Sequence, residues 1–426
     1  MRIYLSSLGC KLNQSEMDAL AGRLAQGGHE IVTSATQAEM CILNTCTVTH
    51  VAAQKSRQAL RRLHRQNPQA RLVATGCYAE LTPGDLRDLP GVELVVGNQE
   101  KENLWRILGG ASEPASQPTP RRRTRALVKI QDGCDNACTY CLIHVARGPQ
   151  RSRPPDQVLA EVGALLDAGY QEIVLTGVHI GAYGRDRGHR PEETDLWDLV
   201  ARILSETPVP RLRLSSIEPW DLTERAFHLW DDPRLCRHLH LPLQSGCDAT
   251  LQRMGRHYTS AEFEALVTAA RRAIPDLAVT TDVIVGFPGE DDDEFAQSLA
   301  FVQRLAFARL HVFPYSLRPG TPAAQMVGQV PPAVKAERSK ALRAVGTASA
   351  RAFRQRFVGQ TRNVLWESRH EQAPLWRGLT DNYIRVVTES TADLRNTLTP
   401  TLLLGLTEGG MQGQIDVPGT LEVPGT

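Results

Sequence analysis

The sequence predicts an α/β protein in three parts: an N-terminal parallel α/β domain, a central partial (β/α)6 barrel and a small C-terminal antiparallel β-barrel. Three observations predict this fold class. Short apolar runs alternate with helical periodicity through residues 1–110 and again from residue 120, as expected where helices connect parallel strands. A stretch rich in Pro, Gly and Ser separates these regions, and the last segment carries strand patterns without long helices.

In the first region, three apolar strands are each followed within a few residues by a cysteine. The strands are 3–5, 40–43 and 72–74, and the cysteines are Cys10, Cys46 and Cys77. Because the ends of neighbouring parallel strands share one edge of a sheet, we expect these cysteines to converge there.

The barrel prediction depends on six apolar strands separated by helical segments. The strands are 126–131, 172–178, 211–217, 238–243, 279–287 and 309–315, and helices at 156–168, 260–273 and 294–305 lie among them. Six units form a partial barrel, since a closed one needs eight. A basic helix at 334–357 precedes strands at 361–367, 383–388 and 401–406, which predict a small β-barrel. The expected domains are therefore 1–110, 120–352 and 358–422.

The composition is that of a globular protein, with 426 residues, 42% of them hydrophobic. There are 48 Lys and Arg against 47 Asp and Glu, so a nucleic-acid partner has to be met by a local basic patch. No stretch nears 18 uninterrupted apolar residues, and the start has no basic segment followed by a long apolar one. We therefore expect a cytoplasmic protein that does not enter the membrane.

The nine cysteines favour metal binding over a disulfide framework, because the number is odd and reducing compartments keep thiols free. Cys134, Cys138 and Cys141 have the spacing C-x3-C-x2-C, in the loop after the first barrel strand. Three thiolates can hold one corner of a four-iron cubane and leave the fourth iron open, and an open metal site is a reactive one. A zinc site with His144 as the fourth ligand is the alternative.

With Tyr140 in the aromatic position, this segment resembles the C-x3-C-x-aromatic-C signature of the radical S-adenosylmethionine superfamily. The resemblance implies that S-adenosylmethionine chelates the open iron and is cleaved to a 5′-deoxyadenosyl radical. The segment 142–145 departs from the family, which more often has Pro and an aromatic residue there. That departure puts little in doubt about cluster binding.

The first domain resembles the N-terminal domain of the methylthiotransferases through the motifs at 7–14, 44–49 and 75–77. This resemblance implies that Cys10, Cys46 and Cys77 hold a second four-iron cluster, which carries the sulfur to be transferred. The alternative is three unrelated cysteines in the core. The other cysteines, Cys41, Cys236 and Cys247, are interpreted as structural.

Four further segments resemble the subgroup that acts on N6-threonylcarbamoyladenosine 37 of tRNA: 175–181, 215–219, 238–246 and 282–290. The resemblance implies methylthiolation of C2, with one S-adenosylmethionine methylating sulfur and another generating the radical. C2 offers no acidic proton, so acid–base side chains would not suffice. The implied partners are the tRNA anticodon stem-loop, where base 37 is unpaired, and an electron donor.

Two rival functions remain at this point. One is the same chemistry on isopentenyladenosine 37 of tRNA or on an aspartate of a ribosomal protein. The other is a non-catalytic iron–sulfur protein that binds RNA or transfers electrons, which would need no S-adenosylmethionine pocket.

Candidate contacts to S-adenosylmethionine lie near the ends of the barrel strands. Gly177 and Gly286 would let the backbone approach the cosubstrate, Glu218 and Gln244 would hydrogen-bond it, and Tyr140 belongs to the cluster motif. Barrel packing and strand capping are the alternative explanations.

Candidate RNA contacts are arginines on either side of the cysteine loop: Arg121, Arg122, Arg123, Arg125, Arg147, Arg151 and Arg153. They predict a phosphate-binding rim. The last segment, with Trp366, Trp376, Tyr383 and Arg385, resembles the RNA-binding TRAM domain. Its aromatic side chains would either stack on bases or pack in the core.

Overall fold

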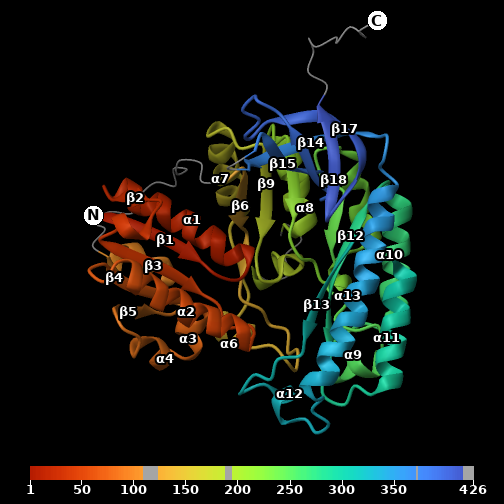
Figure 1. Ribbon diagram of the computed structural model, residues 1–426, viewed down its shortest axis with the longest axis horizontal. Helices are drawn as coiled ribbons and strands as arrows, with labels where there is room; N and C mark the ends of the chain where they lie inside the picture. The colour runs from red at the N-terminus through yellow and green to blue at the C-terminus, as the bar shows by residue number, and fades with distance from the viewer. Residues whose placement is uncertain (109–122, 188–193, 371–372, 416–426) are drawn as a thin grey trace, which may run out of the picture.

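The computed structural model describes residues 1–108, 123–187, 194–370 and 373–415. It places an N-terminal α/β domain beside a partial β/α barrel, with a small β-barrel at one end of the latter (Figure 1). This arrangement confirms the predicted fold class. The predicted linker, with Arg121 and Arg122, and the tail after residue 415 lie outside the described residues.

The N-terminal sheet is parallel, with strand order β2-β1-β3-β4-β5. Its strands are β1 (Arg2–Ser7), β2 (Glu30–Val32), β3 (Met40–Thr45), β4 (Arg71–Gly76) and β5 (Val92–Val96). Helices α1 (Lys11–Gln26), α2 (His50–Gln66), α3 (Cys77–Leu81), α4 (Gly84–Arg87) and α5 (Leu104–Ile107) connect or follow them. Every residue of β3 is buried, because hydrophobic clusters cover both faces of the sheet. That is why β3 and β4 read as continuous apolar runs.

The central barrel is open. Its parallel strands follow the order β6 (Arg125–Lys129), β9 (Glu172–Thr176), β10 (Arg211–Leu214), β11 (His238–His240), β12 (Ala278–Val285) and β13 (Arg309–Pro314). Isolated parallel bridges, Leu212 to Leu235 and Ser216 to His240, join β10 to the β11 side. Within the described chain, β6 and β13 are therefore the two edges of the barrel.

Helices cover the outside of the barrel: α7 (Pro155–Asp167), α8 (Leu196–Glu206), α9 (Asp248–Met254), α10 (Ser260–Ala273), α11 (Asp292–Leu305) and α13 (Pro332–Gln355). The shorter α6 (Ile143–Arg147) and α12 (Pro322–Gln325), and the paired β7 (Gln131–Asp132) and β8 (Arg151–Ser152), belong to the loops. On β12, Val279 and Val283 pack in the main core, whereas Asp282 does not belong to it. Alternate residues of the strand therefore serve the helical layer and the lumen.

The C-terminal barrel is closed in the order β14-β15-β16-β18-β17. Its strands are β14 (Thr361–Arg369), β15 (Leu375–Thr380), β16 (Arg385–Glu389), β17 (Leu398–Thr407) and β18 (Gly410–Ile415). One pairing, β16 with β18, is parallel, which the antiparallel prediction did not include. Trp366 and Trp376 are 0% and 2% exposed in its core, so they are not available to stack on bases.

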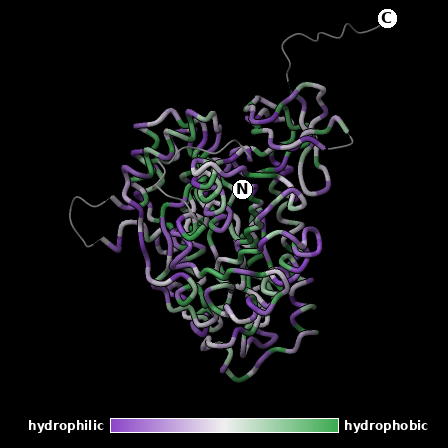
Figure 2. Tube along the Cα trace, turned by 90° about the vertical axis from the view of Figure 1, so that its left-hand side faces the viewer, coloured by the Kyte–Doolittle hydropathy of each residue, from purple (hydrophilic) through white to green (hydrophobic). Residues whose placement is uncertain are grey.

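The N-terminal domain packs across the open side of the barrel. Helix α1 lies against β6, while the Thr47 hydroxyl accepts a hydrogen bond of 2.6 Å from Arg318, beyond the other edge strand. The C-terminal barrel docks at the starts of the barrel strands, where Arg211 donates to the carbonyl oxygens of Leu379 and Thr380. In Figure 2, the hydrophobic segments concentrate inside the larger body and the small barrel stands at its upper end. No helix in the described ranges is long and apolar enough to cross a membrane.

Candidate active site between two cysteine groups

The first group comprises Cys10, Cys46 and Cys77, called the rim cysteines here. They follow β1, β3 and β4, which are neighbours in the sheet, so the structure brings them to one edge as the topology predicts. Gly9, with φ of 95°, permits this approach: a Cβ there would lie 2.7 Å from the Cys46 Sγ. Glycine at this position therefore lets Cys46 reach the start of α1.

Two of the rim thiols, those of Cys10 and Cys46, lie in surroundings that raise the pKa and so disfavour a free thiolate. Cys46 and Cys77 are each 4% exposed. Burial, together with the neighbouring thiols of Cys77 and Cys10, raises the pKa of Cys46 to about 11. Asn98 Nδ2 lies 3.6 Å from the Cys77 Sγ. Such thiols ionise when a metal cation replaces the proton, which suits an iron–sulfur or metal site.

The second group comprises Cys134, Cys138 and Cys141, called the loop cysteines here. All three are half-buried, and burial raises the pKa of Cys141 to about 12. Cys134, Cys138 and His144 line a hollow of about 380 Å³ at the loop after the first barrel strand. That space accommodates a group much larger than a single ion.

The zinc alternative is not favoured by the geometry. Tetrahedral zinc holds thiolate sulfurs about 3.8 Å apart. In the described part of the chain, the loop cysteines and His144 do not form a group whose ligand atoms all lie within 4.8 Å of one another. His240, Asp282 and His311 do form such a group. A cubane, whose ligands are spread over several irons, fits the wider spacing of the loop cysteines.

A buried arginine links the loop cysteines to a predicted cosubstrate contact. Arg256 contacts the Cys138 Sγ at 3.5 Å and forms an ion pair with Glu218. The guanidinium also lies over the rings of Trp220 and Tyr258. Arg256 carries no motif signal, and reasoning from the sequence did not identify it.

His179 is a second unpredicted neighbour of the loop. Its Nε2 lies 2.5 Å from a carboxylate oxygen of Asp221, and its Nδ1 lies 3.3 Å from the Asn136 side chain. Burial disfavours the imidazolium, but hydrogen bonds with Asp221 and Cys134 outweigh it and raise the pKa of His179 to about 9. The side chain is therefore cationic beside the cysteine loop at neutral pH.

The other predicted cosubstrate residues lie at the same end of the barrel. Gly177, Gln244 and Gly286 follow β9, β11 and β12. The rings of Tyr140 and Phe287 pack edge-to-face, with 6.3 Å between their centres. Packing also explains the glycines, because a Cβ at Gly177 would lie 2.8 Å from a backbone oxygen, and one at Gly286 2.4 Å from Lys335. Their contact with S-adenosylmethionine stays a prediction.

Helix α6, which follows Cys141, connects the two cysteine groups. Helix α6 packs on α3, which begins at Cys77. The Asn98 amide that contacts the Cys77 Sγ also donates to the Ala146 carbonyl at 2.6 Å. The two groups therefore share a common wall.

Arg147, at the end of α6, stabilises the packing of the N-terminal domain against the cysteine loop of the barrel. It is 2% exposed and donates to Glu16 at 2.9 Å, to Asp132 at 2.8 Å and to Asn13 at 2.7 Å. Burial opposes ionisation of Glu16, but Arg147 and Lys101 outweigh it and hold the pKa of Glu16 at about 2. Arg147 was expected in the phosphate-binding rim. That expectation is wrong, because its guanidinium is enclosed by the N-terminal domain.

The barrel lumen holds a polar cluster that the sequence did not reveal. His311 Nδ1 and His240 Nε2 lie 3.0 Å and 3.3 Å from the Asp282 Oδ1. The three residues come from the adjacent strands β13, β11 and β12. Strand position alone brings them together, so nothing in local spacing could have identified them.

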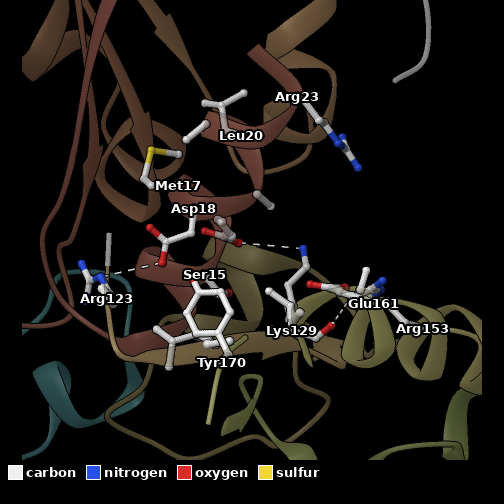
Figure 3. Close-up of a pocket in the computed structure, with 18 of the residues that line it drawn as sticks. Ser15, Met17, Asp18, Leu20, Arg23, Arg123, Lys129, Arg153, Glu161 and Tyr170 are labelled. Carbon is white, nitrogen blue, oxygen red and sulfur yellow. Dashed lines mark hydrogen bonds and ion pairs between the residues drawn. The ribbon is translucent and has the colours of Figure 1, made fainter. Parts of the chain in front are cut away.

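The remaining arginines of the predicted rim differ in availability. Arg151 and Arg123 are both exposed, and Arg123 pairs with Asp18 at 3.7 Å. Arg125 pairs with Glu367 at 2.6 Å, and Arg153 pairs with Glu161 at 2.5 Å. Figure 3 shows Arg123 and Arg153 pointing to these carboxylates in a cleft of about 390 Å³ between α1 and the β6–α7 side of the barrel.

Comparisons with known proteins match both regions. Residues 128–302 match the family model of the radical SAM superfamily, and residues 2–97 match that of Uncharacterized protein family UPF0004. The chain is similar to threonylcarbamoyladenosine tRNA methylthiotransferase MtaB of Bacillus subtilis (39% identity, covering 92% of this chain and 91% of the relative).

Relatives with other named substrates also match. Ribosomal protein uS12 methylthiotransferase RimO of Anaeromyxobacter sp. is 36% identical, covering 87% and 82% of the two chains. The tRNA-2-methylthio-N(6)-dimethylallyladenosine synthase of Sorangium cellulosum is 33% identical, covering 90% and 86%. In fold, the chain resembles the radical S-adenosylmethionine methyltransferase TsrM of Kitasatospora setae (TM-score 0.56, 17% identity, covering 76% and 75%).

Proposed function

The chain belongs to the methylthiotransferase family of radical S-adenosylmethionine enzymes, and on that premise we propose that it converts N6-threonylcarbamoyladenosine 37 of tRNA to its 2-methylthio derivative. As a member, it is an enzyme that uses S-adenosylmethionine and [4Fe–4S] clusters. The substrate proposal is supported by the relative from Bacillus subtilis, which is more similar to the chain than the RimO and dimethylallyladenosine relatives above.

We assign the loop cysteines to the cluster that binds S-adenosylmethionine and the rim cysteines to an auxiliary cluster. Each set offers three thiols, which fits a cubane with one iron left for another ligand. When bound, the first cluster supplies the electron that cleaves S-adenosylmethionine to a 5′-deoxyadenosyl radical, and the second carries the sulfur to be transferred.

The residues of the chain position these groups and exclude water. Arg256 places a positive charge beside Cys138 and orients Glu218. Protonated His179 places a second positive charge beside Cys134. The rings of Tyr140 and Phe287 pack edge-to-face beside the loop cysteines, which fixes the orientation of Tyr140. The N-terminal domain covers the open edge of the barrel, which shields a radical from solvent.

The single observation that carries this proposal is the wall shared by the two cysteine groups. Helix α6 joins the loop cysteines to α3 of the rim, and Arg147 holds the two in place. Transfer of sulfur to a carbon radical requires the two centres to reach one substrate atom, so separate sites would not serve this reaction.

The partner of the enzyme is a tRNA, and we propose that it presents the anticodon stem-loop, in which base 37 is unpaired. Arg123 and Arg151, which retain exposed surface, are the proposed phosphate contacts among the described arginines of the rim. We further propose an unidentified electron donor and a cytoplasmic location, where tRNA and reductant meet.

The test is nucleoside mass spectrometry of tRNA from a host that lacks its own methylthiotransferase, with and without this gene. We expect the 2-methylthio form of threonylcarbamoyladenosine to appear with the wild-type gene. A gene that encodes alanine at the loop cysteines serves as the matched control and should leave the nucleoside unchanged.

The other outcomes are equally informative. A 2-methylthio group on isopentenyladenosine would keep the chemistry and reject the substrate. No change in either nucleoside, with iron-loaded protein present, would direct attention to a protein substrate and reject the tRNA proposal.

A further inference from the structure

Lys11, next to Cys10 of the rim, is a half-buried cation without a counter-ion. In the described chain it forms no hydrogen bond or ion pair, and its Nζ lies 5.8 Å from the centre of the Tyr383 ring. Two other enclosed lysines of this region are compensated. Lys101 pairs with Glu16 at 2.5 Å, and Lys129 pairs with Glu102 at 3.0 Å.

The surroundings of Lys11 carry a surplus of positive charge. Arg125 and Arg213 lie over the same Tyr383 ring, at 5.7 Å and 4.6 Å. Arg211 and Arg213 both form ion pairs with Glu172, at 2.8 Å and 2.7 Å, and Arg125 forms an ion pair with Glu367. Four cations therefore meet two carboxylates. An incompletely neutralised, partly desolvated cluster of this kind favours binding of an anion.

The cluster lies where the three domains meet. Lys11 comes from the first turn of α1, Arg125 and Arg213 from β6 and β10, and Tyr383 from the turn between β15 and β16. Lys11 directly follows Cys10, so its side chain runs from the rim, where the transferred sulfur is proposed to sit, to this cluster. An anion bound there would therefore lie one lysine side chain from the backbone of the rim.

We propose that Lys11 binds the carboxylate of the threonylcarbamoyl group and thereby selects this base over adenosines with apolar or no N6 substituents. The inference rests on the proposed function. In adenine, C2 and C6 are both bonded to N1, so the N6 substituent starts beside the carbon that receives sulfur. A residue beside the sulfur-bearing rim is thus placed to meet that substituent, whereas a backbone phosphate lies on the far side of the ribose.

The experiment measures binding of three anticodon stem-loops to iron-loaded protein in the absence of S-adenosylmethionine. Base 37 is threonylcarbamoyladenosine, its carboxylate methyl ester, or adenosine. We expect wild-type protein to bind the free acid about tenfold or more tightly than the ester, as a charged hydrogen bond is typically worth. The Lys11→Met variant should bind the acid loop about tenfold or more weakly than wild type. Its affinities for the ester and adenosine loops should equal those of wild type.

Two further variants complete the design. Lys11→Arg keeps the charge and should retain most of the preference for the acid. Lys340→Met removes a charge from the exposed face of α13 and should change none of the three affinities. Iron content confirms that each variant keeps its clusters, and the comparison of acid with ester needs no variant.

Equal binding of acid and ester by wild-type protein would overturn the proposal. An equal loss of all three affinities in Lys11→Met would also overturn it and point to a backbone phosphate. Failure of the proposed function would look different. Wild-type protein would then bind the acid preferentially, yet leave the threonylcarbamoyladenosine loop unmodified when S-adenosylmethionine and reductant are added.

Discussion

The rim and the loop present the same three thiols by different means. The loop cysteines are separated by two or three residues, so local chain geometry brings them together. The rim cysteines are more than thirty residues apart and meet because β1, β3 and β4 are parallel neighbours. The comparison teaches that the loop site is specified by sequence spacing and the rim site by sheet topology. Different substitutions should therefore remove iron from each.

The largest effect is expected when either set is removed. Wild-type protein reconstituted without oxygen should carry about eight irons, as two cubanes require. Cys134→Ala/Cys138→Ala/Cys141→Ala should retain about half of the iron, and so should the corresponding triple variant of the rim. Both should show no methylthiolation. Full iron retention in either variant, measured by colorimetric assay, would refute its assignment.

The next effect distinguishes topology from spacing. Gly9→Ala places a Cβ 2.7 Å from the Cys46 Sγ, so it should remove most iron from the rim while the loop site stays loaded. Gly28→Ala is the matched control, because Gly28 also has positive φ but nothing lies within 4 Å of its added Cβ. If both variants kept all their iron, the close approach of Gly9 to Cys46 would have no role in cluster binding.

A smaller effect tests the lock between the two sites. Arg147→Met leaves Glu16 and Asp132 without their buried partner, and the free energy of unfolding should fall by about 3–5 kcal/mol. The exposed Arg151→Met, four residues away, should change it by less than about 0.5 kcal/mol. Urea denaturation monitored by circular dichroism measures the free energy of unfolding of both variants. Equal losses would contradict a stabilising role of Arg147 between the two sites.

The smallest effect is a pH dependence from Glu16. Its pKa is about 2 in the folded protein and has an ordinary value of 4.5. Its stabilising contribution is therefore complete above pH 4.5 and is lost as the pH falls toward 2. The difference in unfolding free energy between wild type and Glu16→Gln should narrow by about 1 kcal/mol from pH 6 to pH 4. A constant difference would mean that the pKa of Glu16 is the same in the folded and the unfolded chain.

The same contrast explains what the sequence can predict. The spacing of Cys134, Cys138 and Cys141 predicted one metal site, and the convergence of Cys10, Cys46 and Cys77 followed from the expectation of a parallel sheet. Strand β15 was missed because Gly378 and polar residues interrupt its apolar pattern. The contacts that assemble domains carry no local signal.

Arg147 shows this limit most clearly. In the sequence it lies among other arginines and is typical of a solvated basic rim, yet its partner Glu16 is 131 residues away. Arg256 and His179 were missed for the same reason, because only the folded barrel brings them to the loop cysteines. Trp366 and Trp376 illustrate the reverse case, since closure of the barrel buries side chains that looked available for RNA.

The central claim is that the two cysteine groups form one active site, and electron paramagnetic resonance of reduced protein tests it most directly. Magnetic coupling between two reduced clusters falls steeply with distance. We predict that the spectrum of wild-type protein is broadened by coupling and differs from the sum of the spectra of the two triple cysteine variants. A wild-type spectrum equal to that sum would place the clusters too far apart to act on one base.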